Sequence, residues 1–170
     1  MELIEKLTDE QISDIAETID ALDNICYLNR GTGEYILMMN NKMLSEYGIS
    51  WEDEEENEDD VLSDDDSLDW QKDMYNEVKA DMAKIYSWEL KDTIRIEKPE
   101  SHESFEFMER FVDEIIPEGN LKREFWEALS RSHPFRNFNA IVHNCKYRED
   151  WFRFKQMAME EYLRKKIGKY

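Results

Sequence analysis

Apolar residues recur at helical spacing along much of the chain. The clearest helix begins at Thr8, which can cap the backbone of Gln11 in a capping box, and it should end near Asp23. The same periodicity predicts a short helix over 40–47, stopped by Gly48, and later helices over about 70–89, 105–115, 121–129, 134–145 and 148–167. Pro134 suits the first turn of its helix. Helix is therefore the main element of the fold.

Three short apolar runs instead have the pattern of strands. Residues 25–28 and 35–39 flank a turn that contains Gly31 and Gly33, which is typical of a hairpin. Apolar residues on both faces of 35–39 predict that this strand lies inside the sheet and not at its edge. Residues 93–97 alternate as a third strand before Pro99. The pattern predicts an α+β protein: a small antiparallel sheet of about three strands with packed helices, and a C-terminal lobe of about four helices.

Charge divides the chain at a similar place. The net charge is −19, with a balance of −25 over residues 1–118 and +6 over residues 119–170. We expect two parts, residues 1–99 and a basic, aromatic-rich helical lobe at 100–170, together in one compact unit. The acidic part would repel nucleic acid and anionic membranes, whereas the basic part could attract them. Mutual attraction of the two parts within the fold is the favoured interpretation.

The stretch 52–69 is the most acidic part of the chain, with 12 acids and no Lys or Arg. Repulsion and few apolar groups favour a mobile, solvated loop. A calcium loop or a mimic of nucleic acid is the alternative. Asp64 and Asp66 begin like a calcium loop, but the glycine is missing and Tyr75 stands where the closing glutamate belongs.

Few residues suggest catalysis. Cys26 and Cys145 form no CxxC pair, and the chain has no phosphate-loop, dinucleotide, zinc-protease or nucleophile-elbow motif. The sequence therefore predicts no catalytic residue, no cofactor and no metal site. The start of the chain lacks the features of a secretory signal, and no apolar run reaches ~18 residues. We expect a cytoplasmic protein with reduced thiols and no membrane contact.

Basic and aromatic residues alternate near the C-terminal end, at 135–138 and 151–155. Such rings could stack on nucleic-acid bases between cations. Helical spacing instead favours a place in the core for Phe135 and Phe138, with Ile141 and Val142, and for Trp151 and Phe154, with Met157 and Ala158. Phe152 is the one ring of these two segments that falls outside the apolar faces. The surface would then carry a basic patch, a possible binding site, made of Arg131, His133, Arg136, Arg153 and Lys155.

Several short segments carry a family resemblance. FEFMERF at 105–111, FRNF at 135–138 and DWFRF at 150–154 stand in the order and spacing seen in uncharacterised protein family 0158, a bacterial family. The TGE turn at 32–34 and the Trp70-Gln71 helix start are similar to it as well. The resemblance implies a small cytosolic α+β protein and brings no established activity or catalytic residue. The family is often glycine-rich just before FRNF, whereas this chain has Ser130-Arg131-Ser132-His133-Pro134.

Three functional hypotheses follow. The first is a non-enzymatic interaction or regulatory protein that binds another protein through a groove or the basic patch. The second is nucleic-acid binding by the C-terminal lobe, which the net charge of the whole chain disfavours. The third is an enzyme that uses His133 or His143 on an anionic substrate. The oligomeric state is left open.

Overall fold

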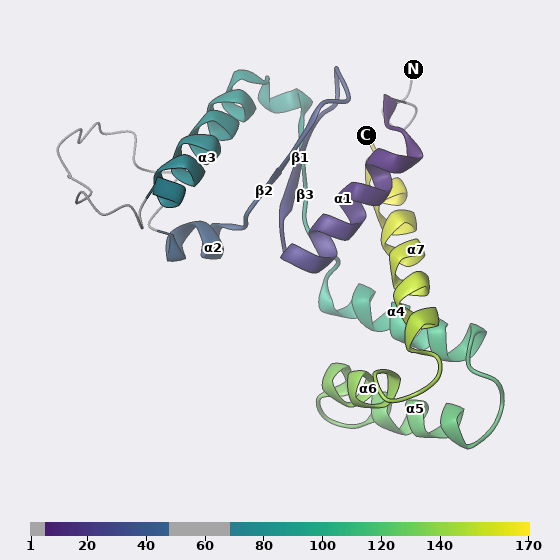
Figure 1. Cartoon of the computed structure of the whole chain (residues 1–170). Helices are drawn as coiled ribbons and strands as arrows, with labels where there is room; N and C mark the ends of the chain where they lie inside the picture. Colours follow the sequence, from purple (N-terminus) through teal and green to yellow (C-terminus); the bar gives the residue numbers. More distant parts are fainter. Residues whose placement is uncertain (1–5, 48–68) are drawn as a thin grey trace. The chain divides into compact units, whose positions relative to one another are not determined.

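The computed structural model describes residues 6–47 and 69–170 (Figure 1). The described residues fall into two compact units. The first unit comprises residues 6–8, 18–47, 69–98 and 170, and the second comprises 9–17 and 99–169. Helix α1 (Asp9–Leu22) thus contributes residues to both. Most of the acidic stretch, Gly48 and the first five residues lie outside the described residues, as do the interpretations placed on them.

A three-stranded antiparallel sheet organises the first unit, which confirms the α+β class. Its strands β1 (Ile25–Asn29), β2 (Tyr35–Met38) and β3 (Thr93–Ile96) have the order β2-β1-β3. The prediction that the second strand is internal was therefore wrong. Apolar side chains on both faces of a strand indicate that both faces are buried. Whether the strand is central or at an edge depends instead on how many neighbouring strands share its backbone hydrogen bonds. The central strand is β1, and four of its five residues are buried.

The hairpin turn depends on Asn29 and one glycine. The side-chain oxygen of Asn29 accepts hydrogen bonds from the backbone N–H groups of Gly31, at 2.8 Å, and Thr32, at 3.1 Å. Gly33 has φ 78°, a left-handed conformation that L residues rarely adopt, and its N–H donates to the Asn29 carbonyl. Of the two glycines predicted to need positive φ, only Gly33 has it.

Helices α2 (Asn41–Glu46) and α3 (Asp69–Ser87) form a core with β2. The Asn40 side chain caps α2 by accepting from the Met43 N–H at 3.0 Å. The core residues are Ile36, Met38, Leu44, Val78, Met82 and Ile85. After α3, the 3-10 turn η3 (Leu90–Asp92) leads into β3.

The second unit contains α4 (Ser101–Glu114), α5 (Asn120–Ser130), α6 (Pro134–Val142) and α7 (Arg148–Ile167). Phe111 on α4 is fully buried at the centre of its core. The ring centroids of Phe125, Phe138, Trp151 and Phe154 lie 5.1–6.4 Å from that of Phe111. Such edge-on ring contacts add to the free energy gained from apolar burial.

Several large apolar residues are exposed, among them Met157, which helical spacing placed in the core. Trp70 is 54% exposed, Met157 57%, and Trp126 and Ile115 37% each. Helix α4 ends at Glu114, so Ile115 leaves its apolar face and Ile116, which is 2% exposed, is buried instead. On α7 the neighbouring Met159 is buried in place of Met157. Apolar spacing alone does not fix how far a buried face extends around a helix.

Candidate functional site

The aromatic residues near the C-terminal end are mostly core residues. Phe138 is 0% exposed, Trp151 6% and Phe154 4%, which confirms the prediction from helical spacing for these three rings. The prediction was wrong for Phe135, which is 39% exposed and meets Phe105 edge-on at 6.4 Å. Phe152, the ring outside the apolar faces, is 41% exposed. Phe152 is therefore the most exposed ring of the two basic-aromatic segments, 135–138 and 151–155.

The five residues of the basic patch lie on three segments: the turn between α5 and α6, α6 itself and α7. Arg131 follows α5, His133 is the N-cap of α6, and Arg136 is an exposed residue of α6. Arg153 is exposed on α7, whereas Lys155 is half-buried and has contacts of its own. Residues two apart on a helix point in directions about 200° apart, so Arg153 and Lys155 do not share a face. The patch as a single binding surface stays a prediction.

Arg131 borders a shallow hollow between α5 and α6. The hollow has a volume of about 330 Å³ and is lined by Glu124, Glu127, Ala128, Arg131, Asn137, Ala140 and Ile141. Arg131 pairs with Glu127 at 3.3 Å, and the Asn137 side chain donates to the Ser132 carbonyl at 2.9 Å. Two carboxylates against one guanidinium leave this hollow without the positive charge that an anion would need.

A more compact group of cationic and aromatic side chains joins the end of α6 to the start of α7. The Arg148 guanidinium lies 5.3 Å from the centroid of the Phe152 ring, and the His143 ring lies 5.9 Å from it. The Lys146 ammonium lies 5.1 Å from the Tyr147 ring centroid. We call these five residues the α6–α7 surface. A cation over an aromatic face is a favourable electrostatic contact that remains available at an exposed site.

The charge of this surface is only partly neutralised. Arg148 lies 4.0 Å from Glu149, at the outer limit of an ion pair, and both side chains are more than half exposed. Exposed pairs of this kind contribute little and are screened by salt. An acidic partner could therefore compete for Arg148.

His133 and His143 lie at opposite ends of α6. His133 has a left-handed backbone, φ 58°, at the start of α6. His143 is the C-cap of α6, which ends at Val142, so the prediction that this helix extends through Cys145 was wrong. Neither histidine lines the hollow described above. Among the described residues, no three His, Cys, Asp or Glu side chains gather to hold a metal ion.

The cysteines are free thiols. Burial raises the pKa of Cys26 to about 12, which keeps its thiol protonated. Cys145 is half-buried, and its Sγ lies 3.5 Å from the Val142 carbonyl oxygen.

The sequence analysis placed Phe152 outside the apolar face of its helix, but it did not identify Arg148 as the cation that contacts this ring. The signal was present, because residues four apart on a helix lie on one face and Arg148 precedes Phe152 by four. The contact of His143 with Phe152 could not be found in this way, because it depends on the turn between α6 and α7.

The fold and this surface define a small α+β protein that displays a cation–aromatic cluster on a helical unit. No helix in the described part of the chain is both long and apolar enough to cross a membrane.

The family model of uncharacterised protein family UPF0158 matches residues 69–167, from the start of α3 to the end of α7. The chain belongs to this family. The match includes the α6–α7 surface but not the hairpin turn at 32–34. No curated protein and no solved structure matches the chain.

Proposed function

We propose that this chain is a non-enzymatic interaction or regulatory protein of the cytoplasm, and that it binds another protein through the α6–α7 surface. The observation that carries the proposal is the exposed ring of Phe152 between Arg148 and His143. Rings and arginines of this kind dominate the binding energy of protein interfaces when a partner covers them.

The partner surface should be acidic. Residues 119–170 hold 12 Lys and Arg against 6 acids. Complementary charge speeds encounter and selects among partners, while a covered ring supplies the affinity. A partner that presents carboxylates around an apolar depression would satisfy Arg148 and Lys146 and would bury Phe152.

The test is a quantitative affinity purification from the native cell with the full chain as bait. Phe152→Ala combined with Arg148→Ala should reduce recovery of a specific partner at least tenfold. The matched control is Tyr75→Ala with Lys79→Ala on α3, because the Lys79 ammonium lies 5.4 Å from the Tyr75 ring centroid and that ring is 41% exposed. The control removes a pair of the same chemistry from the first unit.

A partner retained by both double variants would reject the α6–α7 surface as the interface. The basic patch is tested separately with the double variant Arg136→Ala and Arg153→Ala, since both arginines are exposed. If every specific partner also survives this change, the interaction proposal fails for the second unit.

Nucleic-acid binding is a second candidate, because an exposed ring beside cations can stack on a base while the cations contact phosphates. The net charge of −19 opposes it at long range. Fluorescence anisotropy of a labelled single-stranded RNA with the full chain at low salt tests it. Binding that falls steeply with salt and is lost in Phe152→Ala would favour this candidate, whereas no binding at low salt would exclude it.

A further inference from the structure

One face of the sheet is only partly covered by helix. Ile36 and Met38 of β2 face the α2–α3 core, and Tyr27 of β1 packs against the same core. The register pairs Ile36 with Tyr27 and Tyr27 with Arg95, so these three side chains lie on one face of the sheet. Arg95 is exposed, however, and so is Glu97 two residues later. The β3 side of this face is therefore polar and open to solvent.

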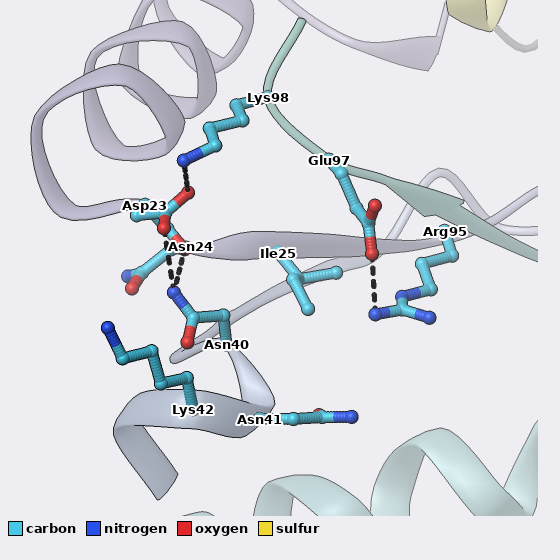
Figure 2. Close-up of a pocket in the computed structure, with 9 residues that line it drawn as sticks. All are labelled: Asp23, Asn24, Ile25, Asn40, Asn41, Lys42, Arg95, Glu97 and Lys98. Atoms are coloured by element: carbon cyan, nitrogen blue, oxygen red, sulfur yellow. Dashed lines mark hydrogen bonds and ion pairs between the residues drawn. The ribbon is translucent and has the colours of Figure 1, made fainter. Parts of the chain in front are cut away.

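A hollow of about 300 Å³ lies on this side of the first unit (Figure 2). Its walls come from the turn after α1, from the start of α2 and from β3 with the residues that follow it. The lining residues are Asp23, Asn24, Ile25, Asn40, Asn41, Lys42, Arg95, Glu97 and Lys98. Three cations face two carboxylates, so the hollow has a net positive charge.

Contacts within the hollow already occupy both carboxylates. Asp23 accepts from the Lys98 ammonium at 2.9 Å and from the Asn40 amide at 2.9 Å, one contact on each carboxylate oxygen. The same amide donates to the Asp23 carbonyl at 3.0 Å, and the Asn40 side-chain oxygen caps α2. Glu97 accepts from Arg95 at 2.5 Å. These contacts pair both carboxylates within the protein.

Lys42 is the cation that remains. In the described part of the chain no hydrogen bond or ion pair joins the side chain of Lys42 or of Asn24 to another residue. Figure 2 shows the Lys42 side chain extending from α2 toward the turn that carries Asn24. The Lys42 ammonium and the Asn24 amide thus both border the hollow, and neither donates to an acceptor among the residues that the structure describes.

We propose that this hollow binds a small molecule through a compact oxyanion, a carboxylate or a phosphate. Lys42 supplies the opposite charge and Asn24 a hydrogen-bond donor, while the ion pairs of Lys98 and Arg95 neutralise the two carboxylates that would otherwise repel an anion. Charge-assisted hydrogen bonds of this type are about twice as strong as neutral ones. The site lies in the first unit and is independent of the partner proposed for the α6–α7 surface.

The proposal is tested by NMR titration of the full ¹⁵N-labelled chain at constant ionic strength. Inorganic phosphate is the probe in one arm and citrate in the other, with chloride as the reference salt. We expect saturable shifts of the amide signals of Asn24, Asn40 and Lys42 in one arm, and that arm identifies the oxyanion. Lys42→Gln should weaken binding roughly tenfold.

The matched control is Lys72→Gln, which removes an exposed lysine of α3 outside the hollow and should leave the titration unchanged. Shifts that do not saturate with either probe would overturn the proposal. So would equal affinities of the wild type and Lys42→Gln, since the proposal assigns the charge contact to Lys42. The spectra of each variant also report whether it is folded.

Discussion

The ammonium group of Lys122 donates to the main-chain carbonyl of Asp113 at 3.0 Å and joins the start of α5 to the end of α4. The side chain of Lys122 is only 10% exposed, and its ammonium also lies 3.0 Å from Glu118. A lysine at this depth is uncommon unless its charge is paired, and here it satisfies a carbonyl in the last turn of a helix. This contact connects two helices of the second unit.

Lys122→Met should lower the free energy of unfolding by about 1–3 kcal/mol, because the Asp113 carbonyl loses its donor while the aliphatic stem is kept. Urea unfolding followed by circular dichroism measures the change. Lys165→Met on the exposed face of α7 is the control and should leave the midpoint within error. Equal midpoints for the two variants would show that the buried ammonium adds nothing to stability.

Phe111→Ala should be among the most destabilising changes in the chain, at about 3–5 kcal/mol, because four other rings contact this fully buried side chain. Phe135→Ala, which truncates a ring that is 39% exposed, should cost far less. Chemical denaturation compares the two. If Phe111→Ala does not fold, Phe111→Leu is measured in its place and should still be more destabilising than Phe135→Ala. A smaller loss of stability for the Phe111 variant than for Phe135→Ala would contradict the prediction.

His133→Gly should stabilise the protein by roughly 0.5–1 kcal/mol, because His133 has φ 58° and its Cβ is strained in that conformation. Ser132→Gly, one residue earlier and without a positive φ, should instead destabilise. Thermal unfolding of both variants decides the sign, and a lower melting temperature for His133→Gly would refute the argument.

Alkaline pH should weaken the fold through Cys26. Burial raises the pKa of this thiol from 9.0 to about 12, so above pH 9 the unfolded chain loses the proton that the folded chain keeps. Stability from this group is complete below pH 9 and is lost as the pH rises toward 12, at about 1.4 kcal/mol per pH unit. Urea unfolding between pH 8 and 10 measures the slope.

Cys26→Ala should flatten that slope, although it lowers the stability itself by leaving a small cavity. Cys145→Ala is the control, because it removes the other thiol of the chain. Parallel pH profiles for the wild type and Cys26→Ala would show that this thiol does not control the alkaline response.

The helices could be predicted closely because apolar spacing records which side of each helix is buried. The range 148–167 matches α7, and Pro134 lies in the first turn of α6 as expected. Strand order could not be predicted, because a residue such as Ile36 is apolar whether its strand has one neighbour or two. Met157 was placed wrongly because apolar character does not reveal which of two nearby methionines, Met157 or Met159, turns inward.

The candidate sites were harder to predict than the elements. Phe152 could be identified by elimination, and Arg148 lies four residues earlier on the same helix. The hollow that contains Lys42 depends on segments far apart in the chain, since Asp23, Asn40 and Lys98 meet only after β1 pairs with both of its neighbours. Periodicity reports on one element at a time, so a site assembled from three segments leaves no local pattern.

The central position of β1 also has a consequence for synthesis on the ribosome. Leu28 pairs with Tyr35 within the hairpin, but Cys26 pairs with Ile96, which is translated 70 codons later. A nascent chain that has emerged only as far as α3 therefore carries β1 with one set of backbone groups unpaired. Pairing between distant segments is slow compared with hairpin closure, so arrival of β3 sets the earliest moment at which the sheet of the first unit can be complete.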